Sequence, residues 1–285
     1  MSLKKFVQNK EVREMLKETF FKPKIEYSKD IKAKAYCSNT GIIGTAFDYL
    51  LRFYVERINE GRVVSGLLLV EQMVPYLHDD LRTEAIVQLK MLKESKEEFM
   101  RIKGLNDELI ITLLQISHFD IMYRSKTVDY FPDDIGKVDI DAILEMKELY
   151  KLLDENDWKC SQRCVLNPHF EKASLLVNGA DADIILDDML VDIKVIQQPG
   201  MSREIFNQLL GYYTLYRIGG FDKDGRFPIN RVAIYSARYG EFLKYDIESL
   251  MSNNTYSDFE DNFICKAKEL YNHSDKFIEE VRSMR

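Results

Sequence analysis

The chain has 285 residues with a net charge of −7, and its 46% hydrophobic and 31% charged residues exclude an intrinsically disordered protein. The acidic balance argues against a protein that coats nucleic acid through phosphate contacts, but it is compatible with a site built on acidic metal ligands. No apolar stretch is long enough to span a bilayer, and residues 1–10 lack the core of a signal peptide, so we expect a cytoplasmic protein without a membrane partner.

Hydrophobic periodicity predicts helices through most of the first half of the chain, over residues 1–22, 45–58, 81–102, 107–122 and 139–153. Thr45 and Asp48 have the spacing of a capping box, which predicts that the second helix begins at Thr45. Asp139 is the expected N-cap of the last. Between about 57 and 157 only helical patterns occur, and we interpret this stretch as a helical insertion that could dock a protein partner.

After Trp158 the pattern changes to strands, expected over residues 175–177, 182–186, 190–196, 231–237 and 241–245. Asp187 and Asp188 are expected to form the tight turn between the second and third of these. Ser202 caps a predicted helix over 202–218, and a terminal helix is expected over about 257–283. Strands mixed with helices indicate an α/β fold, here a single domain over 1–285 with a core of about 36–56 plus 160–250.

The segment from Gly179 to Lys194 carries the most chemistry. Side chains alternate along a strand, so Asp192 and Lys194 share one face, and a hairpin would bring Asp183 to the same spot. Two converging carboxylates repel each other unless a cation lies between them. Magnesium prefers oxygen ligands and leaves positions for water and phosphate. The pattern therefore predicts metal-dependent hydrolysis of a phosphodiester.

The short acid-x-Lys pattern is common in this chain, because it also occurs at Asp30, Glu94, Glu145 and Asp157. Only at Asp192 does it lie on a predicted strand with another acid one hairpin upstream. The alternative interpretation is a solvent-facing strand on which Asp192 pairs with Lys194 at the surface.

Three motifs occur in order: Gly179 to Asp183, Asp192-Ile-Lys194, and Gln208-x-x-x-Tyr212. Together they resemble the PD-(D/E)XK nuclease superfamily, and most closely its RecB-like branch. The resemblance covers about residues 165–245 and 40–56. It implies a restriction-endonuclease-like mixed sheet flanked by helices. It also implies that Asp183 and Asp192 bind Mg²⁺, with Mn²⁺ as a substitute, while Lys194 assists catalysis and Gln208 shapes the site.

The segment from Gly44 to Asp48 resembles an early helix of the same branch, with Asp48 where other members carry a His. Asp48 either binds the metal or only closes the capping box at Thr45. Glu56, two turns further on the same face, is a further candidate. Tyr212 lies on the face of Gln208 and either supports the site or packs in the core.

The expected activity is that of a Mg²⁺-dependent deoxyribonuclease acting on DNA. Four basic residues are either contacts to the DNA backbone or ordinary surface charges: Lys172, Arg203, Arg231 and Arg238. The alternative function is that of a non-catalytic nucleic-acid-binding or assembly module on a nuclease-like fold. The four cysteines, expected to be thiols, lack the clustered spacing of the iron–sulfur members of the branch.

Overall fold

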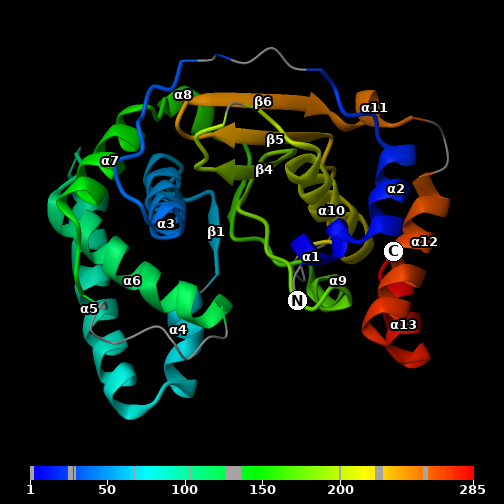
Figure 1. Cartoon of the computed structure of the whole chain (residues 1–285), viewed down its shortest axis with the longest axis horizontal. Helices are drawn as coiled ribbons and strands as arrows, with labels where there is room; N and C mark the ends of the chain where they lie inside the picture. The colour runs from blue at the N-terminus through cyan, green and yellow to red at the C-terminus, as the bar shows by residue number, and fades with distance from the viewer. Residues whose placement is uncertain are drawn as a thin grey trace.

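Six strands form one mixed sheet with helices on both of its faces (Figure 1). The computed structural model describes residues 3–24, 28, 30–66, 68–102, 104–125, 136–198, 200–221, 227–252 and 256–285. The strands are β1 (Val63–Ser65), β2 (Cys164–Leu166), β3 (Ile184–Leu186), β4 (Met189–Lys194), β5 (Arg231–Ser236) and β6 (Glu241–Asp246).

The sheet follows chain order from β1 to β6. Strand β3 is antiparallel to both of its neighbours, β2 and β4, and β5 is antiparallel to β6. The pairs β1–β2 and β4–β5 are parallel. This topology confirms the predicted α/β class and the mixed sheet.

Helices precede, interrupt and follow the strands. Those of the first half are α1 (Leu3–Gln8), α2 (Lys10–Thr19), α3 (Thr40–Ile58), α4 (Leu69–Met73), the 3₁₀ turn η1 (Val74–Tyr76), α5 (Asp79–Arg101), α6 (Asp107–Ser125), α7 (Ile140–Lys151) and α8 (Glu155–Trp158). Those of the second half are α9 (Glu171–Leu176), α10 (Arg203–Gly219), α11 (Ile247–Leu250), α12 (Tyr256–Tyr271) and α13 (Asp275–Arg282). None of the described helices is both long and apolar enough to cross a bilayer.

Two hydrophobic cores lie on opposite faces of the sheet, because successive strand residues point to opposite sides. Val191 and Ile193 of β4 join the core formed with α3, α5, α6 and α7. Leu190 joins the other core, formed with α1, α2, α9, α10, α12 and α13. The alternation places Asp192 and Lys194 on the α10 side of β4. The central strands β2 to β5 are thus largely buried on both faces.

The helix predicted from Thr45 begins earlier, at Thr40, and the predicted capping box is wrong. Asn39 provides the N-cap instead, because its side-chain oxygen accepts a hydrogen bond from the backbone N–H of Ile42. Thr45 and Asp48 therefore lie inside α3, which leaves the Asp48 side chain available for other contacts.

Two further predictions are wrong. The strand predicted over 175–177 does not form, because these residues are the last two of α9 and its C-cap, Val177. Three apolar residues in a row do not distinguish a strand from a helix turn. The helical insertion also contributes a strand, since β1 joins the edge of the sheet through β2. The parallel pairing of β1 with a strand about 100 residues away leaves no local pattern to detect.

Two predicted long helices are each divided in two. Asn9 ends α1 and caps α2 by accepting from the N–H groups of Glu11 and Val12. Near the C-terminus, Asn272 adopts a positive φ of 55° and Ser274 caps α13. The predicted N-caps Asp139 and Ser202 and the turn at Asp187 are confirmed. All four cysteines are free thiols.

Candidate active site

The hairpin formed by β3 and β4 brings Asp183 and Asp192 to the same end of the sheet. Ile184 pairs with Val191, so the antiparallel register continues to Asp183 opposite Asp192. The Asp183 carboxylate accepts a hydrogen bond from the backbone N–H of Ile193 at 2.6 Å. That bond fixes the Asp183 side chain against β4, beside the carboxylate on the neighbouring residue.

Lys194 forms a close ion pair with Asp192. Its Nζ lies 2.8 Å from Oδ1 and 2.6 Å from Oδ2 of the Asp192 carboxylate. The Asp192 side chain is 1% exposed and the Lys194 side chain 19%. The predicted alternative of a solvent-facing surface pair is therefore wrong, because both charges are largely withdrawn from water.

Burial, together with the nearby carboxylates of Asp183 and Asp48, raises the pKa of Asp192 to about 6 against the lowering effect of Lys194. Burial works to lower the pKa of Lys194, but the Asp192 and Asp183 carboxylates outweigh it and raise this pKa. The Asp192 carboxylate is thus costly to ionise where it stands, and a further positive charge beside it would stabilise the anion.

These residues lie in a cleft of about 1090 Å³, into which both halves of the molecule contribute side chains. Helix α3 contributes Asp48 and Arg52, the hairpin contributes Asp183, Asp192 and Lys194, and α10 contributes Gln208 and Tyr212. Residues far apart in the sequence thus share one space that is wide enough for a ligand.

Gln208 and Tyr212 lie one turn apart on α10, and Gln208 Nε2 donates a hydrogen bond to the Tyr212 hydroxyl at 3.0 Å. Tyr212 also packs against Phe170, with ring centroids 6.2 Å apart. Burial raises the pKa of Tyr212 well above its usual value, and the Asp192 and Asp183 carboxylates raise it further. Tyr212 is therefore a core residue, as one of its two interpretations predicts, and its side chain also lines the cleft.

Asp48 pairs with Arg52, one turn further along α3, through both carboxylate oxygens. Arg52 is 8% exposed and also lies near Asp183. Burial works to lower the pKa of Arg52, but the carboxylates of Asp48 and Asp183 outweigh it and raise this pKa. Arg52 was not among the site residues predicted from the sequence. Its spacing of four residues from Asp48 on one helix was the available indication of the pair.

Glu56 does not line the cleft. It forms an ion pair with Lys96 of α5, with 2.7 Å between carboxylate oxygen and ammonium nitrogen. This pair joins α3 to the helical insertion.

The four proposed DNA-contacting cations are also engaged elsewhere. Arg238 is 0% exposed and pairs with the equally buried Glu145, so its predicted role as a DNA contact is wrong. Lys172 pairs with Glu280, and Arg231 with Asp188. Arg203 donates to the backbone oxygen of Phe20. None of the four lines the cleft.

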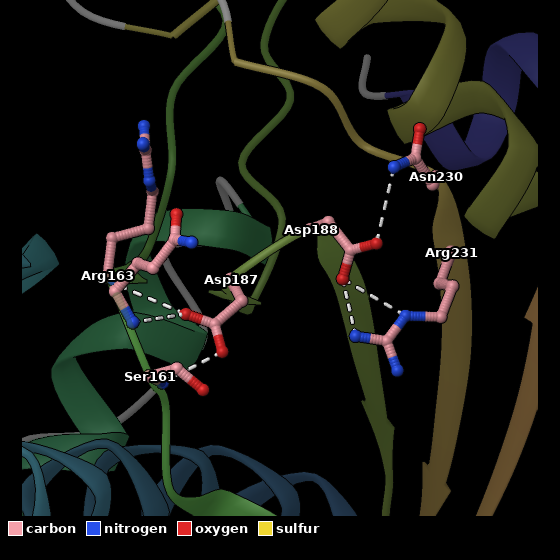
Figure 2. A network of polar contacts seen from close by, with 7 residues as sticks. Ser161, Arg163, Asp187, Asp188, Asn230 and Arg231 are labelled. Atoms are coloured by element: carbon pink, nitrogen blue, oxygen red, sulfur yellow. Dashed lines mark hydrogen bonds and ion pairs between the residues drawn. The ribbon is translucent and has the colours of Figure 1, made fainter.

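The closed end of the same hairpin carries two more acids with structural partners (Figure 2). The Asp187 carboxylate accepts hydrogen bonds from the backbone N–H groups of Ser161, Gln162 and Arg163, at 2.8, 2.7 and 3.1 Å. Asp188 pairs with Arg231 at the start of β5. The turn acids therefore tie the hairpin to the segment before β2 and to β5.

The donor atoms at the open end are carboxylate oxygens. Within the part of the chain that the structure describes, no three His, Cys, Asp or Glu side chains gather closely enough to bind a metal on their own. Magnesium does not require such a set, because one or two carboxylates with waters and substrate phosphates complete its coordination. Asp183 and Asp192 therefore suit magnesium better than zinc, which takes three or four protein ligands.

No family model, curated protein or solved structure matches the chain, so its function is inferred here from its own residues.

Proposed function

We propose that this protein is a metal-dependent nuclease that hydrolyses DNA phosphodiester bonds at the cleft containing Asp183, Asp192 and Lys194. One observation carries the proposal: two carboxylates and a lysine of the β3–β4 hairpin, with Asp192 buried and the other two half-buried, share a cleft of about 1090 Å³. Buried charges are costly and rare unless they serve a purpose at a site. In keeping with the motifs, we further propose that the mixed sheet is of the restriction-endonuclease type.

Asp183 and Asp192 would hold a Mg²⁺ ion, for which Mn²⁺ would substitute. When bound, this ion supplies a positive charge to the phosphate oxygens and lowers the pKa of a water molecule. Lys194 adds a fixed positive charge at the same place, where it orients the attacking water or offsets charge that develops on the phosphate. Gln208 would shape the site by holding the Tyr212 hydroxyl through its hydrogen bond.

Arg52 gives the site a second cation. In the structure its guanidinium neutralises Asp48, and the pair lines the same cleft as the hairpin acids. If Asp48 joins the metal ligands, the guanidinium becomes available to a phosphate oxygen, for which its planar fork is well suited.

The test is cleavage of labelled DNA in Mg²⁺, in Mn²⁺ and in EDTA. We expect Asp192→Asn and Lys194→Ala each to lower the cleavage rate by about 10²- to 10⁴-fold, as loss of an acid–base or electrostatic group does. EDTA should abolish cleavage.

Matched controls come from another acid-x-Lys triplet in this chain. Asp157 pairs with Lys244, and Lys159 with Glu155, all at the surface. Asp157→Asn and Lys159→Ala should therefore cut like the wild type. Binding of DNA without cleavage in any metal would instead support the non-catalytic binding or assembly module.

A further inference from the structure

Part of the lining of the cleft is apolar. The side chains along it come from α4, the segment after η1, and α6 of the helical insertion: Leu69, Met73, Leu77, Met122 and Tyr123. Tyr123 lines the cleft and is 54% exposed, so its ring is accessible to a ligand. An apolar wall with an open aromatic face stabilises a ligand only if that ligand brings an apolar surface of its own.

Two lysines also line the cleft. Lys4 and Lys5 come from α1, a helix that Figure 1 draws apart from α4 and α6. Lys4 lies 3.6 Å from Glu204 in an exposed ion pair, whereas Lys5 has no ion-pair partner among the residues that the structure describes. Both side chains are therefore accessible to a ligand that carries negative charge.

Helix α1 is held firmly in this position. The backbone N–H of Leu3 donates to the carbonyl of Gly179, and Leu3, Phe6 and Val7 are each 1% exposed. Close approach to α10 depends on Gly211, because a Cβ there would lie 2.9 Å from Leu3 Cδ1. The two lysines therefore stand on a packed helix that lines the same cleft as the acids.

We propose that the cleft takes an unpaired nucleic-acid strand, with a base stacked on Tyr123 and the phosphates led past Lys4 and Lys5 to Asp183 and Asp192. The inference rests on the proposed function and adds the strandedness of its substrate. Bases in a duplex have their faces covered by their neighbours, so a duplex offers nothing to the apolar wall. An unpaired base has a free face, and stacking on aromatic side chains combined with a basic track is how single strands are bound.

Binding tests this inference independently of cleavage. The probes are fluorescent single strands of DNA and of RNA, about 15 nucleotides long, and a DNA hairpin duplex of equal length. Fluorescence anisotropy is measured in Ca²⁺, an oxygen-seeking ion that does not adopt the strict octahedral geometry of Mg²⁺. Gel analysis of the probes checks that they remain intact. We expect either single strand to bind at least about tenfold more tightly than the duplex.

The decisive variant is Tyr123→Ala, which should weaken single-strand binding by about 5- to 150-fold, whereas Tyr123→Phe keeps the ring and should stay within about twofold of the wild type. Phe21→Ala is the matched control, because Phe21 is 60% exposed but lies outside the cleft lining. Lys5→Gln should reduce the slope of log affinity against log salt concentration by about one. Lys10 is exposed and lies outside the cleft lining, so Lys10→Gln should leave this slope unchanged.

Equal affinity for duplex and single strands, or wild-type binding by Tyr123→Ala, overturns the inference. Its failure is distinguishable from that of the proposed function. Cleavage of duplex as fast as of single strands would support the nuclease and contradict the strandedness. Single-strand binding that Tyr123→Ala abolishes, without cleavage in Mg²⁺ or Mn²⁺, would support the binding cleft and contradict the nuclease.

Discussion

At the closed end of the β3–β4 hairpin, Asp187 accepts three backbone hydrogen bonds, and these outweigh the effect of burial and lower its pKa. At the open end of the same hairpin, burial raises the pKa of Asp192 to about 6. Two aspartates of one hairpin, about three residue pairs apart, thus have pKa values that are shifted in opposite directions. The closed end satisfies its charge with backbone donors, whereas at the open end burial outweighs the ion pair with Lys194, so that the proposed metal ion would further stabilise the Asp192 anion.

The largest effect should come from Asp183→Asn. The amide oxygen still accepts the hydrogen bond from the N–H of Ile193, but the negative charge is lost. We expect metal-dependent cleavage to fall by about 10²- to 10⁴-fold, while the free energy of unfolding changes by no more than about 0.5 kcal/mol. Cleavage assays and chemical denaturation measure the two quantities. A variant that unfolds easily would show that Asp183 is mainly structural.

The reverse is expected of Asp187→Ala. It removes the acceptor of three N–H groups and places Ala at a φ of 53°, so we expect a loss of about 2–4 kcal/mol in the free energy of unfolding. Asp187→Asn should lose less, because Asn tolerates this φ and retains one acceptor oxygen. Cleavage per folded molecule should stay near that of the wild type. A selective loss of cleavage would show that the two ends of the hairpin are coupled.

The smallest expected effect is a change in how the free energy of unfolding of the metal-free protein depends on pH. The pKa of Asp187 is lowered on folding, so its contribution to stability is present above the unfolded pKa and is lost as pH falls through the folded one. The pKa of Asp192 is raised from 3.8 to about 6, so folding is favoured below this range and loses stability as pH rises through it. Chemical denaturation in EDTA across pH 3–7 measures both effects. Asp187→Ala should reduce the rise of the free energy of unfolding with pH, whereas Asp192→Asn should reduce its fall.

The sequence predicted the hairpin and α10 well, because both depend on local patterns: alternation along β4, the turn at Asp187, and the N-cap Ser202. It thereby placed Asp183 beside Asp192. It did not predict Arg52 or Tyr123, because their position at the cleft depends on how α3 and α6 pack against the sheet. It also assigned Arg238 to the surface, since no local pattern shows that Glu145 would meet it in the core.

The cleft takes its side chains from segments made at widely separated times during synthesis. The helix that bears Arg52 leaves the ribosome early, the hairpin much later, and Tyr212 after that. A nascent chain that ends before α10 therefore has only part of the proposed site. The proposed nuclease activity would therefore arise only after the second hydrophobic core has closed over the sheet.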